Sequence, residues 1–315
     1  MKGFAGKLMR QKESTIFLAL LGIMALIYVF APKFLSGANM YLVTRQVAYT
    51  AIAALGVFFV ILTAGIDLSV GSIIGLSGVT CAMSMAAGLH PVPAVGVGLA
   101  TGALVGAFNG AITAYVGVTP FIVTLGMLSM ARGAVYALTK GESVRKIPKS
   151  FIQFGSADIL GIPLILVILI ILAVISHIIV KYTVFGRRIM AVGGNEEAAE
   201  LSGINVKSVK FRTYIICGIL SSVTGIMFIT RFRSAQADAG NGMELDAIAA
   251  AVIGGTSLFG GEGSVAGVLI GAMIMGVIRN GLVLMEVSTY WQRLIIGSII
   301  VLAAIVDVIR KRTGK

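Results

Sequence analysis

The stretch IPLILVILIILAVISHIIV, residues 162–180, decides the fold class of this chain. It contains no Asp, Glu, Lys or Arg, and its length matches the roughly 20 apolar residues that a helix needs to cross a bilayer. The rest of the chain is similar, because 57% of its 315 residues are hydrophobic and only 12% are charged. Soluble globular proteins carry about 25% charged residues. These features predict an all-α, polytopic transmembrane bundle.

Nine further apolar runs accompany this stretch, which makes about ten membrane spans in one permease-sized domain covering residues 1–315. The ten runs are 14–31, 47–64, 69–88, 93–116, 120–138, 162–180, 211–230, 245–259, 264–284 and 291–309. The eighth is short, so a half-span or re-entrant piece is an alternative there. The unbroken runs exclude a transmembrane β-barrel, whose strands alternate polar and apolar residues.

Basic residues indicate the orientation of the bundle. They cluster at both termini and in the connection between the sixth and seventh runs: Lys2, Lys7, Arg10, Lys12, Lys181, Arg187, Arg188, Lys207, Lys210, Arg310, Lys311, Arg312 and Lys315. With ten spans all three clusters fall on one side, so the positive-inside rule makes both termini cytoplasmic. The basic connection 139–161 then lies outside, against the rule. The net charge of +12 follows from these flanks and does not predict nucleic-acid binding.

The connection 186–206 is the most polar segment between apolar runs, and we expect a short cytoplasmic helix there. Asn195 is the expected N-cap, with glutamates in the first turns, where negative charge suits the helix dipole. Gly203 ends the helix. We predict that a soluble partner docks on this coupling segment; a merely solvated loop is the alternative. The predicted contact residues are Gly193, Gly194, Asn195, Glu196, Glu197, Ala198, Glu200 and Leu201.

Polar residues within the apolar runs are candidates for lining a translocation path. They are Asn109, Thr119, Thr124, Ser129, Arg132, Asn280 and Gln292. Neutral hydroxyl and amide groups suit a polyol substrate, although hydrogen bonding between helices explains them equally well. Arg132 either reaches outward or pairs with an acid. Asp67 and Asp246 are expected at helix ends, with Asp67 capping the helix that begins near Ser69.

Enzymatic chemistry and metal binding find no support in these residues. The chain has two histidines and two cysteines, without metal-ligand spacing, and no GxxxxGK[ST] phosphate loop. We therefore expect no cofactor, no metal and no catalytic residue.

Glycines recur every fourth residue at Gly102, Gly106 and Gly110, which predicts closely packed helices. A weak internal similarity relates DLSVG at 67–71 to EGSVA at 262–266, which would make the two segments an internal repeat. Repeats of this kind are common in transporters, and chance similarity is the alternative.

Four stretches taken together resemble the permease subunits of bacterial ABC-type monosaccharide importers. They are TAGIDLSVGS at 63–72, TPFIVTLGM at 119–127, GRRIMAVGGNEEAAELSGI at 186–204 and AAAVIGGTSLFGGEGS at 249–264. The resemblance covers nearly the whole chain, and within the family the likeness to ribose permeases is greatest. The GIDLSVG stretch is similar to the sugar branch rather than to the related branched-chain amino-acid permeases.

The resemblance implies a multi-pass protein of the bacterial inner membrane that works by alternating access. It implies a path formed with a second permease copy, embedded in lipid, and ATP hydrolysis in a separate ATP-binding-cassette subunit. It also implies a periplasmic sugar-binding protein, for which 139–161 is a candidate contact. The coupling helix of the family corresponds to 193–203. The alternatives are an ion-coupled secondary transporter, a permease for a hexose, a sugar-like signal or a branched-chain amino acid, and a membrane enzyme or structural subunit.

Overall fold

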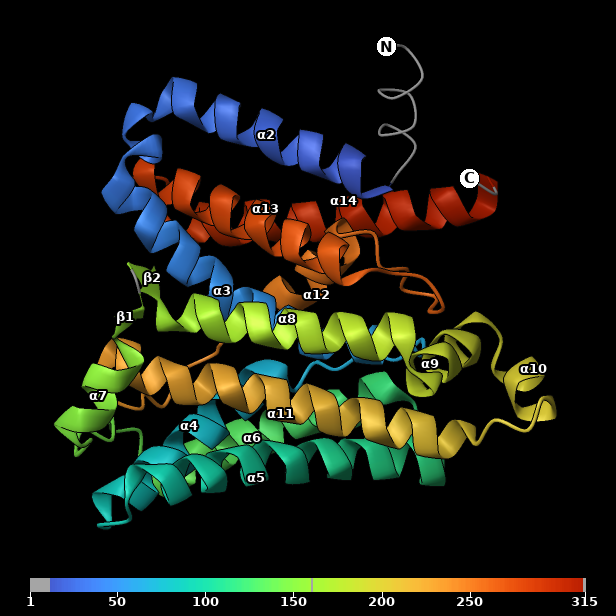
Figure 1. Cartoon of the computed structure of the whole chain (residues 1–315), viewed down its shortest axis with the longest axis horizontal. Helices are drawn as coiled ribbons and strands as arrows, with labels where there is room; N and C mark the ends of the chain where they lie inside the picture. The colour runs from blue at the N-terminus through green and yellow to red at the C-terminus, as the bar shows by residue number, and fades with distance from the viewer. Residues whose placement is uncertain (1–11, 160, 314–315) are drawn as a thin grey trace.

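The structure, a computed structural model, describes residues 12–159 and 161–313 as a bundle of helices that run between two ends (Figure 1). The helices are α2 (Lys12–Phe30), α3 (Gly37–Ile61), α4 (Val70–Ala86), α5 (Pro91–Ala111), α6 (Pro120–Thr139), α7 (Lys149–Gly155), α8 (Leu164–Tyr182), α9 (Val184–Gly194), α10 (Glu196–Leu201), α11 (Val206–Phe232), α12 (Met243–Ile253), α13 (Val265–Leu284) and α14 (Thr289–Thr313). A 3-10 turn η1 (Pro32–Leu35), a π-helical turn η2 (Ile112–Val116) and the two-residue strands β1 (Asp158–Ile159) and β2 (Ile162–Pro163) complete the described elements. The all-α class is confirmed.

Eight described helices are long and apolar enough to cross a membrane: α2, α3, α5 with η2, α6, α8, α11, α13 and α14. The third and eighth predicted runs correspond to shorter helices, α4 with 17 residues and α12 with 11. Three run boundaries were wrong by five residues or more, one of them the end of the eighth run, since α12 stops at Ile253 instead of residue 259. α3 begins at Gly37 and α11 at Val206, because Ser36 and Asn205 cap them ahead of polar first turns that lack the hydropathy of a span.

The two ends of the bundle carry different elements (Figure 1). α9 and α10 lie at one end, here named the α10 end, together with the start of α2 and the C-terminal end of α14. The turn η1, helix α7 and the β1–β2 pair lie at the opposite, α7 end. A chain that crosses the membrane ten times would place these elements at the same two ends. The number of spans and the cytoplasmic location of the termini stay predictions. Lys2, Lys7, Arg10 and Lys315, on which the orientation partly rests, lie outside the described residues.

The core centres on α3 and α11, which pack against each other; α11 also packs against α4 and α5, and α3 against α12 and α13. The middle of α3, including Phe58 and Phe59, is fully buried. Glycine allows α5 and α11 to approach closely, because a Cβ built on Gly102 would overlap the carbonyl oxygen of Gly218, and one on Gly106 would overlap that of Tyr214. The predicted role of the glycine spacing in close packing is confirmed.

Candidate functional site

The coupling segment forms two short helices joined at Asn195. Thr183 caps α9 by accepting a hydrogen bond from the Gly186 amide at 3.1 Å. The Asn195 side chain caps α10 by accepting from the Ala198 amide at 2.9 Å. Gly203 ends α10 with φ +79°, so the predicted cap and stop are confirmed. Helix α9 was not predicted, because Gly193 and Gly194 are typical of a linker but form its last turn.

The outer surface of α10 is acidic with one apolar residue. Glu197, Glu200 and Ala198 are exposed, and Leu201 keeps 84% of its surface accessible. Glu196 instead pairs with Lys210 of α11, with 2.6 Å between carboxylate and ammonium, which ties α10 to the bundle. The face available to a partner therefore combines two free carboxylates with a leucine.

Gly193 carries the contact between this segment and the rest of the bundle. A Cβ at Gly193 would overlap the carbonyl oxygen of Leu62 and the amide nitrogen of Gly261. Those two backbone groups hydrogen-bond to each other at 3.0 Å. A Cβ at Gly260 would lie 2.7 Å from the Ala64 nitrogen and 2.8 Å from the Gly193 Cα. The coupling segment thus packs backbone to backbone against two connections, 62–69 before α4 and 254–264 before α13.

These two connections contain the two segments with weak internal similarity, 67–71 and 262–266. The Asp67 carboxylate accepts from the Ser69 amide at 2.9 Å and from its hydroxyl at 2.6 Å, next to the start of α4. Ser264 caps α13 by accepting from the Gly267 amide at 3.1 Å. Asp67 lies just before α4 as expected, but it does not cap the helix: Ser69 is the N-cap residue, and the fully buried Asp67 side chain instead closes a turn onto Ser69. The two segments play similar structural roles, whereas the repeat itself stays a prediction.

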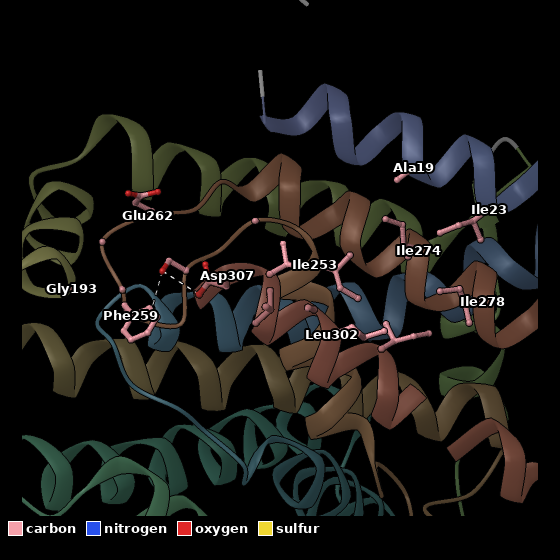
Figure 2. A pocket seen from close by; sticks show the side chains of 18 of the residues that line it. Ala19, Ile23, Gly193, Ile253, Phe259, Glu262, Ile274, Ile278, Leu302 and Asp307 are labelled. Atoms are coloured by element: carbon pink, nitrogen blue, oxygen red, sulfur yellow. Dashed lines mark hydrogen bonds between the residues drawn. The ribbon is translucent and has the colours of Figure 1, made fainter. Parts of the chain in front are cut away.

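A cavity of about 910 Å³ adjoins the coupling segment (Figure 2). At one end it is lined by Gly193 and the connection 254–264, where Asp307 of α14 accepts from the Leu258 amide at 3.0 Å. The rest of its wall is apolar, including Ile23, Ile274 and Leu302. Such a lining suits hydrocarbon rather than a polyol.

Three of the predicted path residues converge on the chain around the start of α4. Asn109 donates to the Ser69 hydroxyl at 2.9 Å. Thr124 donates to the Ile66 carbonyl at 3.3 Å and to that of Pro120 at 2.9 Å. Arg132 donates to the Gly71 carbonyl at 3.3 Å, and these side chains hold the non-helical connection 62–69 and the first turn of α4 in place.

Arg132 also reaches the connection 233–242 between α11 and α12. One guanidinium nitrogen donates to the carbonyls of Ala237 and Ala239, each at 2.9 Å. Among the described residues Arg132 forms no direct ion pair, although the Glu244 carboxylate of α12 lies close enough to interact with it, so an acid is nearby as expected. Three backbone carbonyls take up its donors instead, which joins α6, α4 and the connection 233–242.

The remaining predicted path residues lie apart from this cluster. Asn280 of α13 and Asn39 of α3 exchange two amide hydrogen bonds, each 2.9 Å long. Gln292 donates to the Val287 carbonyl at 2.8 Å. Thr119 and Ser129 are exposed at and along α6. The structure thus brings together three of the predicted path residues, and a role for any of them in transport stays a proposal.

A polar cavity of about 240 Å³ between α3, α11, α12 and α13 was not predicted from the sequence. Gln46, Tyr49, Arg231, Gln236, Asn241 and the pair Asp246–Arg279 are among the residues that line it. The Arg279 guanidinium donates to both Asp246 oxygens, at 2.8 and 2.6 Å. The available signal was Arg279 itself, an arginine within the apolar run 264–284 that requires a partner.

Residues 39–304 match the protein family described as "Branched-chain amino acid transport system / permease component". The chain belongs to this permease family. It is 42% identical over 304 residues to the ribose import permease protein RbsC of Escherichia coli K12, covering 95% of this chain and 94% of that protein. Identity to RbsC of Bacillus subtilis 168 is 41% over 300 residues, covering 95% of this chain and 92% of that protein.

The D-allose transport system permease protein AlsC of E. coli K12 is 38% identical over 308 residues, covering 97% of this chain and 94% of that protein. No solved structure is a significant match. The family and the apolar helices together make this chain a multi-pass protein of the bacterial inner membrane.

Proposed function

We propose that this chain is the transmembrane permease subunit of an ATP-driven importer for ribose or a similar monosaccharide. The observation that carries the proposal is the 42% identity to a ribose import permease over 95% of the chain. The family description itself names branched-chain amino acids, so that substrate class is an alternative. Sugar is favoured because the relatives compared above are named for ribose and allose and match almost from end to end.

ATP hydrolysis takes place in a separate ATP-binding-cassette subunit that docks on the exposed face of α10. The proposal draws support from the two free carboxylates, Glu197 and Glu200, beside the exposed Leu201. An apolar anchor inside a charged rim is a usual composition for such a contact. Glu196 is less available, because Lys210 already neutralises it.

Movement of α10 is transmitted inward through Gly193. Because Gly193 touches the backbone of Leu62 and Gly261 without an intervening side chain, a displacement of α9 acts directly on the connections that precede α4 and α13. Closely packed backbone is poorly compressible, so it shifts as a unit. The connection 62–69 then moves α4, and Arg132 carries this movement to the connection 233–242. This chain of contacts is the proposed basis of alternating access.

Further partners complete the assembly. A second copy of the permease and lipid cover the apolar surfaces of α2, α6 and α14, whose exposed residues include Val29, Ile122 and Leu302. The large cavity beside the coupling segment has the apolar lining that acyl chains favour. A periplasmic sugar-binding protein delivers substrate at the α7 end, where the connection 139–161 is a candidate contact.

The test is uptake of radiolabelled D-ribose by cells that lack this chain and then regain it, with and without its cognate ATPase. We expect uptake that requires both proteins, survives a protonophore and stops when ATP is depleted. Uptake restored without any ATPase, or abolished by the protonophore with ATP intact, would favour an ion-coupled transporter instead. Normal ribose uptake in the deletion strain, with no other ribose route, would redirect the substrate to a hexose, a sugar-like signal or an amino acid.

A further inference from the structure

The polar cavity defined above is balanced in charge. Its lining includes two arginines, Arg231 and Arg279, and two aspartates, Asp238 and Asp246. Asp246 and Arg279 form a bidentate pair and neutralise each other. The formal charge of the lining is therefore zero, while Arg45 close by adds one positive charge outside it. A neutral occupant fits this balance.

A buried hydroxyl in the cavity wall has no partner. Tyr49 of α3 keeps only 1% of its surface accessible, and its hydroxyl makes no hydrogen bond to the described residues. Its ring packs edge-on against Phe228 at 4.8 Å, while the Arg231 guanidinium lies 5.2 Å from the ring centroid. Buried polar groups are nearly always hydrogen-bonded, and although the Arg45 side chain is close enough to interact with Tyr49, it makes no hydrogen bond of normal geometry to the hydroxyl, which leaves room for a further partner.

Three amide side chains line the same space. Gln46 comes from α3, and Gln236 and Asn241 come from the connection 233–242. Within residues 12–159 and 161–313, none of these three side chains forms a hydrogen bond to protein. A carboxamide donates and accepts, as does a hydroxyl group. Aromatic walls with several unused donor–acceptor groups suit a small molecule that carries hydroxyl groups.

The size and position of the cavity limit which molecules could occupy it. About 240 Å³ is below the ~300–1,000 Å³ of sites for drug-sized ligands, so the occupant has few heavy atoms. The cavity includes the C-terminal end of α11, which lies at the α7 end. If α10 is cytoplasmic, this end faces the periplasm.

We propose that this polar cavity is an entry subsite that holds one neutral monosaccharide by hydrogen bonds from Tyr49, Gln46, Gln236 and Asn241. The proposal rests on the function proposed above and deepens it, since it places a sugar contact in the permease itself. Arg132 supports the subsite from outside the cavity, because it holds the carbonyls of Ala237 and Ala239 in the connection that carries Gln236 and Asn241.

The first test is protection of an introduced thiol by D-ribose. The native Cys81 and Cys217 are both buried, so Gln236→Cys in the full chain, studied in membrane vesicles, gives a site with little background. Glu142→Cys, exposed in the connection between α6 and α7, is the matched control. We expect D-ribose to slow modification by a membrane-impermeant methanethiosulfonate at position 236 and not at 142, and sucrose of equal osmolality to have no effect.

The second test is uptake by Tyr49→Phe, which removes only the hydroxyl, with Tyr136→Phe on the exposed surface of α6 as its control. Loss of one hydrogen bond should lower ribose uptake at limiting substrate roughly two- to tenfold, with normal amounts of assembled ATPase. Equal thiol modification with and without ribose, in a permease that does transport ribose, would overturn the subsite. Protection at position 236 in a chain that fails every sugar-uptake assay would overturn the importer function while supporting the subsite.

Discussion

Replacing Gly193 by alanine tests the proposed contact between the coupling segment and the bundle. The new methyl group would overlap the Leu62 oxygen and the Gly261 nitrogen, and these are backbone atoms that cannot move aside as a flexible side chain would. Overpacking typically costs about 1–3 kcal/mol, and separating the Leu62–Gly261 hydrogen bond adds about 1 kcal/mol. Alanine recovers up to ~1 kcal/mol of helix propensity. The expected net loss is roughly 1–4 kcal/mol.

Gly194→Ala is the matched control, since a Cβ there meets nothing within 4 Å although the residue shares the same helical turn. We expect this variant to be as stable as the parent, or up to ~1 kcal/mol more stable. The assay is SDS-induced unfolding of the purified permease, followed by circular dichroism, with ATP-driven uptake measured in parallel. Gly193→Ala should unfold at lower SDS and should lose uptake more than it loses ATPase binding. Equal stability of the two variants would refute the packing argument.

Three further predictions test individual side chains. Glu197→Lys should weaken copurification of the ATPase while leaving membrane insertion intact, and unchanged copurification would count against α10 as the docking helix. Asp67→Ala should destabilise the permease by about 1–3 kcal/mol in the same unfolding assay, because the buried Ser69 amide loses its acceptor, whereas Asp67→Asn keeps an acceptor oxygen and should lose less. Asn280→Ala should lower stability by about 1–3 kcal/mol, since it leaves the buried Asn39 amide short of a partner, and it should leave the sugar concentration for half-maximal uptake unchanged. A change in that concentration with normal stability would show instead that Asn280 lines the path.

Local signals in the sequence predicted the parts of the fold that depend on neighbouring residues. Hydropathy located the long helices, since a bilayer requires about 20 apolar residues wherever a helix crosses it. Asn195 and Gly203 marked α10 correctly, because capping and left-handed stops depend on a few adjacent residues. The spacing of Gly102 and Gly106 predicted a close helix contact but could not name its partner, Gly218.

Contacts between segments that are distant in the chain could not be predicted from local sequence signals. Two acceptors of Arg132 are backbone carbonyls of the connection 233–242. Because every residue has a backbone carbonyl, the sequence does not indicate which ones accept these hydrogen bonds. The polar cavity was missed for a related reason, because its lining comes from four helices and one connection that are far apart in the chain. The substrate is read mainly from relatives, since neutral amides and hydroxyls are not specific to one sugar.

The amide pair between Asn39 and Asn280 has a consequence for synthesis of the protein. The two residues are 241 positions apart, so at ~5–20 residues per second the ribosome reaches Asn280 roughly 12–48 s after Asn39. During that interval α3 is already available for insertion, and the Asn39 amide has its local acceptor, the Phe34 carbonyl, but not its distant partner. A nascent chain that stops before α13 retains an Asn39 side-chain oxygen without its donor at the α2–α3 corner. The pair therefore marks a late step of assembly, at which an incomplete permease differs chemically from a finished one.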